Sequence, residues 1–108
     1  MTMWKLFVLV YIFLLTACAG LIQSTSISEA YKKYEAQEFE QTLELISRAE
    51  NFKKTTPEMK AKLTYLKAQT LERLGQQKTA NTLYEYLVEE HKDSQYSYLA
   101  SKKLNTKL

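Results

Sequence analysis

The sequence is poor in the residues that build reactive centres. Among its 108 residues there are one cysteine and one histidine. A single cysteine leaves no internal disulfide, and a single histidine leaves no obvious base for a nucleophilic triad. A glycine-rich phosphate loop is also missing. We therefore expect a protein that is not an enzyme.

Proline and glycine are equally scarce, with only Gly20, Pro57 and Gly75 in the whole sequence. Such a chain is expected to consist mostly of helices joined by short turns. The 15 basic and 12 acidic residues are interspersed rather than clustered. No basic stripe of the kind that binds nucleic acid results, so no nucleic-acid partner is expected.

The single histidine lies in the segment Glu89-Glu90-His91-Lys92-Asp93, which holds several groups that could ligate a metal ion. Consecutive residues on a helix point in different directions, and metal sites use recognisable ligand spacings. The simpler interpretation is that His91 interacts with the dipole at a helix C-terminus. We predict no metal site here.

An apolar run from Leu6 to Leu15 follows Lys5, close to the start of the chain. Its length fits the roughly 7–15 apolar residues of a secretory signal and falls short of the roughly 20 that cross a membrane. The run ends in Leu15-Thr16-Ala17-Cys18. This tetrapeptide resembles the lipobox of a bacterial lipoprotein signal peptide. An uncleaved anchor with an incidental cysteine is the alternative.

The lipobox resemblance implies that residues 1–17 are removed by cleavage between Ala17 and Cys18. Cys18 would then carry diacylglycerol on its thiol and an acyl chain such as palmitate on its amine, with no other cofactor. Two or three acyl chains anchor a protein stably, whereas one binds only marginally. Because Ala19 rather than Asp follows the cysteine, the expected location is the outer membrane, facing the periplasm. Residues 18–26 would form a short lipidated tether.

Capping signals and apolar spacing predict five helices in the remaining chain. Ser26 and Glu29 match a capping box at the start of the first helix. Pro57 suits the first position of the third, and Gly75 suits a left-handed turn after it. The predicted helices cover residues 27–37, 39–52, 57–74 and 77–91, with a fifth that begins after Asp93-Ser94 and frays near Asn105.

The chain also contains a weak internal repeat. Aligning Gln37 with Gly75 superposes the two predicted hairpins, and this offset defines the repeat. The residues that carry the pattern are Ala68, Gly75, Ala80 and Leu87 in the second hairpin and Ala30, Phe39 and Ala49 in the first. In the first hairpin, Gln37 replaces the turn glycine and Thr42 replaces the central alanine.

On these residues, the region 27–108 resembles a degenerate tetratricopeptide repeat (TPR) domain, a family whose repeats have about 34 residues. The resemblance implies an all-α fold of antiparallel helical hairpins, with about two repeats and a C-terminal capping helix. A plain helical bundle is the alternative, because hairpins with small residues at their crossings arise easily.

In TPR domains the first helix of each pair lines a groove that binds an extended or helical peptide. By this resemblance, the groove would contain Tyr31, Glu35, Tyr65, Gln69 and Arg73. Tyrosine suits such a surface because it combines a large apolar body with a polar tip. The alternative is that the tyrosines fill the core, and we expect this of Tyr34 and Tyr84.

These features predict a lipid-anchored envelope scaffold or adaptor that holds a protein partner at the membrane. An exclusion or immunity lipoprotein and a pilotin-type chaperone for a secretion or pilus component are the alternatives. Two repeats bury little surface, since solenoids generally need about three. The exposed end could therefore also dock onto a second copy and form a homo-oligomer.

Overall fold

The computed structural model describes residues 26–52 and 54–106, and its regular secondary structure there is entirely helical. Residues 26–35 form a first helical segment. It is followed by α2 (Phe39–Glu50), α3 (Pro57–Arg73), α4 (Gln77–Glu90) and α5 (Gln95–Asn105). The predicted all-α fold is therefore confirmed. Cys18, Ala17 and the proposed signal peptide lie outside the described residues.

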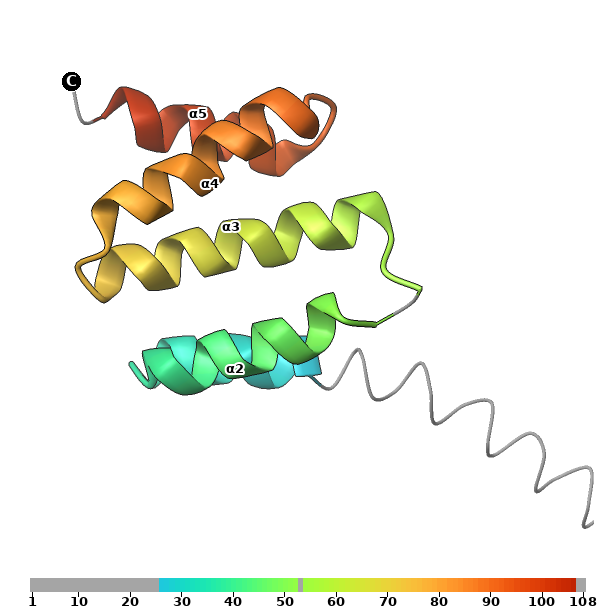
Figure 1. Ribbon diagram of the computed structural model, residues 1–108, viewed down its shortest axis with the longest axis vertical. Helices are drawn as coiled ribbons and strands as arrows, with labels where there is room; N and C mark the ends of the chain where they lie inside the picture. The colour runs from blue at the N-terminus through green and yellow to red at the C-terminus, as the bar shows by residue number, and fades with distance from the viewer. Residues whose placement is uncertain (1–25, 53, 107–108) are drawn as a thin grey trace, which may run out of the picture.

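Each helix packs against the next along the chain, and the helices form a row of hairpins (Figure 1). The first helical segment and α2 form one hairpin, and α3 and α4 form the second. The last helix, α5, packs on α4 and also contacts α3. Because every second helix returns to the same side of the row, residues from the first helical segment, α3 and α5 can share one face.

The starts of α3 and α5 lie where predicted, and a side chain caps each of them. The side chain of Thr56 accepts a hydrogen bond from the Met59 amide at 3.2 Å, and Pro57 is the first helical residue. The Ser94 hydroxyl accepts from the Tyr96 amide at 3.1 Å. Each side-chain oxygen satisfies an amide that the first helical turn leaves without a backbone partner.

Several predicted helix boundaries differ from the structure by one or two residues. Ser26 is already helical, so it does not stand before the helix as a cap. The Glu29 carboxylate instead lies 3.5 Å from the Lys32 ammonium group, one turn along. At the other end of this hairpin, α2 stops at Glu50 rather than at Phe52, because the Phe52 amide donates to the carbonyl of Ala49, only three residues back.

The two hairpins turn in the same way. Gln37 and Gly75 both adopt a left-handed backbone conformation, with φ of 63° and 81°. In each turn this residue donates its amide to the carbonyl three residues back, and the next residue donates to the carbonyl five residues back. This is the hydrogen-bond pattern of a Schellman motif. The predicted left-handed Gly75 is confirmed, and Gln37 occupies the equivalent position.

Burial repeats with the same period as the turns. Four pairs of positions, each related by the offset between Gln37 and Gly75, are at most 1 % exposed: Ala30 and Ala68, Thr42 and Ala80, Ile46 and Tyr84, Ala49 and Leu87. Small residues at the first two pairs let the helix backbones approach one another. Thr42 stands where the second hairpin has Ala80, and its hydroxyl donates to the carbonyl of Glu38 at 2.9 Å. The hydroxyl is therefore buried with its hydrogen bond made.

The central helix, α3, contributes to both halves of the core. Leu63 and Leu66 pack with the buried residues of the first hairpin, whereas Ala61, Ala68 and Leu71 pack with those of α4 and α5. A helix buried on two sides has apolar residues around much of its circumference. Lys62, Tyr65 and Gln69 of α3 remain only partly buried.

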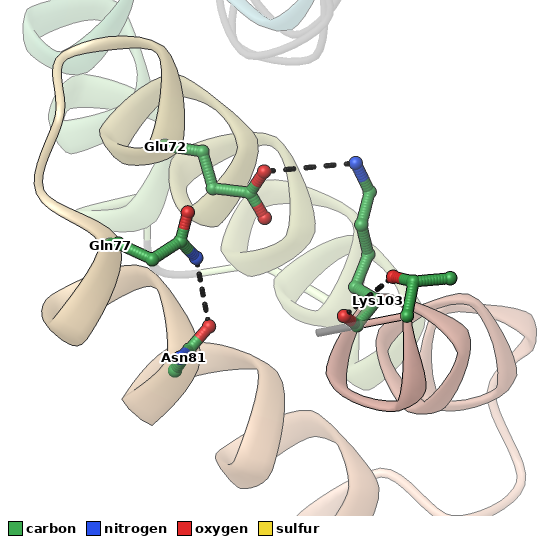
Figure 2. A network of polar contacts seen from close by, with 5 residues as sticks. Glu72, Gln77, Asn81 and Lys103 are labelled. Carbon is green, nitrogen blue, oxygen red and sulfur yellow. Dashed lines mark hydrogen bonds and ion pairs between the residues drawn. The ribbon is translucent and has the colours of Figure 1, made fainter. Parts of the chain in front are cut away.

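The last helix is fixed on both of its neighbours. Ala100 is fully buried in the second core cluster, and Leu104 packs against that cluster. Figure 2 shows Lys103 extending from α5 towards Glu72 near the end of α3, with 3.8 Å between the Lys103 ammonium nitrogen and the carboxylate. Beside this pair, the Gln77 side chain donates to Asn81 within α4 at 2.9 Å. The predicted fifth helix thus covers the second hairpin.

Candidate functional site

Tyrosines from three alternate helices lie together on one side of the row. The Tyr65 ring of α3 has its centre 5.6 Å from that of Tyr96 in α5 and 5.8 Å from that of Tyr84 in α4. Tyr31, from the first helical segment, lies under Lys62 of α3, with 5.3 Å between the ammonium group and the ring centre, and Lys62 lines a hollow together with Tyr96. Tyr84 is fully buried. Tyr31, Tyr65 and Tyr96 are only partly buried, and we call these three residues the tyrosine face.

The hydroxyl groups of the tyrosine face resist ionisation. The pKa of Tyr31 is raised from 10.0 to about 12, first by burial and then by Tyr96 and Tyr65. Burial also raises the pKa of Tyr65, with Glu72 adding to the effect, and that of Tyr96, with Glu58 adding to it. Near neutral pH these hydroxyls stay protonated. They are hydrogen-bond donors and acceptors rather than nucleophiles.

A hollow opens beside the tyrosine face, where the first turns of three helices meet. Its volume is about 290 Å³. The lining residues are Ile27, Thr56, Glu58, Met59, Lys62, Gln95 and Tyr96. Pockets for drug-sized ligands usually measure about 300–1,000 Å³. With a size at the lower limit and apolar walls from Ile27, Met59 and Tyr96, the hollow suits a bulky side chain better than a whole metabolite.

Two cations of α3 rest on aromatic rings of the first hairpin. The Lys62 ammonium lies 5.3 Å from the centre of the Tyr31 ring, and the Arg73 guanidinium lies 5.3 Å from that of Phe39. Phe39 in turn meets the edge of Tyr34, with 5.7 Å between ring centres. Within residues 26–52 and 54–106, neither cation has a carboxylate oxygen within 4.0 Å.

The structure brings together part of the predicted groove. Tyr31 and Tyr65 both belong to the tyrosine face. Arg73 lies against Phe39, eight residues beyond Tyr65 along α3. Glu35 is exposed, and Gln69 is half-buried on the same helix as Tyr65. The predicted set is therefore spread along the first helical segment and α3 instead of forming one compact cluster.

Sequence reasoning missed Tyr96 and Lys62 as members of the site. Lys62 precedes Tyr65 by three residues, a spacing that places both on one side of a helix and could have revealed it. The position of Tyr96 depends on how α5 packs, for which no local signal exists. The expectation that Tyr84 belongs to the core is confirmed, whereas Tyr34 is only half-buried.

The acidic segment around His91 lies at the end of α4. His91 follows the last residue of α4, and its ring meets that of Tyr86 with 5.5 Å between centres. Across residues 26–52 and 54–106, no group of three or more acidic, histidine or cysteine side chains is placed to hold a metal ion.

No known protein family, curated protein or solved structure matches this chain. In the part of the chain that the structure describes, no helix combines the length and apolarity needed to span a membrane.

Proposed function

We propose that this protein is a lipid-anchored adaptor of the bacterial cell envelope that binds a protein partner through its tyrosine face. One observation carries the proposal. Tyr31, Tyr65 and Tyr96 come from three different helices, yet they lie together and remain partly exposed beside a hollow. A core needs no such arrangement, whereas binding surfaces are enriched in tyrosine.

The chemistry of this face suits protein recognition. Tyrosine rings offer apolar contact area at a low cost in side-chain entropy, and their hydroxyls can bond to a partner's backbone. The adjoining hollow would accept one bulky apolar side chain as an anchor. Tyr84 lies beneath Tyr65, with 5.8 Å between ring centres, and holds the surface ring in place.

We further propose that the hairpins form a TPR-like domain, with the first helical segment, α3 and α5 as the groove-lining helices. The matching left-handed turns and the buried pairs that share their offset support this interpretation. The repeat is longer than the usual length of about 34 residues, and the polar connection at residues 51–56 accounts for the difference.

The proposed anchor would place the hollow near the membrane. Ile27 lines the hollow and is the ninth residue after Cys18. At about 3.4 Å per residue, even a fully extended tether spans only about 30 Å. A partner in the same membrane would then meet the hollow at a raised effective concentration, which strengthens weak binding without new contacts.

The anchor is tested by Cys18→Ser in the native host. We expect the wild-type protein in the membrane fraction, with a mass that shows removal of residues 1–17 and addition of acyl chains. The variant should lose the lipid mass and either leave the membrane or retain the signal peptide. An unchanged mass and distribution would show that Cys18 is not lipidated.

The binding face is tested by affinity capture from detergent-solubilised membranes. Tyr31→Ala should abolish capture of the partner. Tyr98→Ala should leave it intact, because Tyr98 is 63 % exposed on α5 and its ring lies against Lys102 rather than on the tyrosine face. Equal capture by both variants, with circular dichroism showing both folded, would disprove the assignment. Capture of a secretion or pilus component would assign the pilotin-type role.

A further inference from the structure

Lys62 and Arg73 are two cationic residues of α3. Their separation in the sequence is close to three helical turns, so both lie on the same side of the helix. At about 1.5 Å per residue, their positions are separated by about 16 Å along the helix axis. Tyr65 and Gln69 stand between them on that side. The two cations thus mark the ends of one stripe beside the tyrosine face.

Lys62 and Arg73 are held differently from the cations of the described chain that pair with a carboxylate, and Lys102, which lies over the ring of Tyr98 on α5, is the comparable case. Lys32, Lys33, Arg48, Lys67 and Lys103 each lie within 4.0 Å of a carboxylate. Lys62 and Arg73 instead rest on the rings of Tyr31 and Phe39. A ring orients a cation through its π face but accepts none of its conventional hydrogen bonds. Both groups therefore keep their N–H donors available for an anion.

We propose that the partner segment is an extended, acidic peptide whose two carboxylates, about five residues apart, bind Lys62 and Arg73. The inference rests on the proposed function and specifies its ligand. An extended chain rises about 3.1–3.4 Å per residue, so five residues span the roughly 16 Å between the cations. An apolar side chain between the two acids would face Tyr65 and Gln69, which stand between the two cations.

Charges on the same face define which register the peptide can take. Glu58 lines the hollow, where it accepts a hydrogen bond from the Ser94 hydroxyl at 3.3 Å. Glu35 is exposed at the end of the first helical segment, the position equivalent to Arg73 in the repeat. These carboxylates would repel an acidic group placed beside them. Lys62 and Arg73 then remain as the two points where a carboxylate is favoured.

The test uses the full-length protein in detergent and three fluorescein-labelled peptides with blocked ends. The peptide EPLTPE carries two glutamates five residues apart, and its prolines keep it extended. LPEPET has the same composition with the glutamates two residues apart, and QPLTPQ has no acidic side chain, while all three carry the same label. Fluorescence anisotropy at low and high salt gives each affinity.

We expect EPLTPE to bind at least about fivefold more tightly than either control, and to weaken as salt is added. Lys62→Met and Arg73→Met should each remove most of this advantage, since methionine keeps an apolar stem against the aromatic ring. Lys67→Met is the matched control on α3, because Lys67 lies 3.9 Å from Glu50 on another side of the helix. That variant should bind EPLTPE like the wild type.

Equal binding of the three peptides, or an unchanged advantage in both Lys62→Met and Arg73→Met, would overturn the inference. Binding to phosphatidylglycerol vesicles that needs both cations, without discrimination among the peptides, would reassign the pair to lipid headgroups. The proposed function fails separately. If the peptides are not distinguished while Tyr31→Ala still loses the captured partner and Tyr98→Ala does not, the adaptor proposal stands and only the acidic-peptide inference falls.

Discussion

Gln37 and Gly75 occupy the same left-handed position at the ends of successive hairpin helices, one repeat apart. Both close the same pair of backbone hydrogen bonds. The conformation is easy for glycine and strained for glutamine, whose Cβ crowds the neighbouring carbonyl. One of two equivalent turns therefore carries a local cost that the other avoids.

Exchanging the residue types should reveal this difference. Gln37→Gly is expected to raise the free energy of unfolding by about 0.5–1 kcal/mol, because relief of left-handed strain outweighs the added entropy of the unfolded chain. Gly75→Gln is expected to lower it by about 1–2 kcal/mol, since an L-residue with a Cβ must then adopt φ near 81°. Urea unfolding followed by circular dichroism measures both changes.

Gln76→Gly is the matched control for the stabilising substitution. Gln76 follows the second turn with φ of −92°, a conformation that glutamine adopts without strain. The same Gln-to-Gly change relieves no left-handed strain there, so it should stabilise the protein less than Gln37→Gly does, or destabilise it. Equal stabilisation at both positions would mean that the gain at Gln37 does not come from its left-handed conformation.

Local signals predicted most helix ends, because the groups that decide them are close in sequence. Pro57, Ser94 and Gly75 each act within a few residues, and each lies where expected. Gln37 carries no such signal, because glutamine does not favour the left-handed conformation. Only its alignment with Gly75 in the repeat pointed to a turn at this position. Residues that meet across helices were harder to predict. Tyr96 approaches Tyr65 only once α5 has folded back onto α4, and Arg73 turns to Phe39 because that ring lies open at the start of α2.

Small residues at the helix crossings should tolerate no enlargement. Ala30 and Ala68 are equivalent in the repeat and fully buried. We expect Ala30→Leu and Ala68→Leu each to lower the free energy of unfolding by about 1–3 kcal/mol, because the added carbons force neighbouring helices apart. Thermal unfolding compares them with Ala36→Leu at an exposed position. A cost no greater than that of Ala36→Leu would mean that the helices are not closely packed there.

The Lys103–Glu72 pair should help to hold α5 against α3. The two groups are 3.8 Å apart, and the Glu72 side chain is only 18 % exposed. A double-mutant cycle with Lys103→Met and Glu72→Gln should give a coupling of about 0.5–1 kcal/mol that shrinks as salt is added. Hydrogen exchange should show the loss of protection concentrated in α5. Additive effects of the two substitutions would mean that the pair does not couple.

The tyrosine face should make the fold sensitive to alkali. The folded protein holds the Tyr31 proton more tightly than the unfolded chain, because its pKa is raised from 10.0 to about 12. As pH rises, the unfolded chain releases this proton first, so unfolding becomes more favourable. The stability linked to this proton is therefore complete below about pH 10 and is lost as the pH climbs to about 12. Tyr65, Tyr84 and Tyr96 act in the same direction, since their pKa values are also raised.

Urea unfolding at intervals from pH 8 to 11.5 measures this loss. The free energy of unfolding should begin to fall near pH 10, and Tyr31→Phe should make the fall shallower because phenylalanine has no proton to release. Tyr98→Phe, at an exposed position outside the tyrosine face, controls for the substitution itself. If the two variants show the same slope as the wild type, Tyr31 ionises equally well in the folded and unfolded chain. Its ring would then be exposed to water instead of lying against α3 and α5.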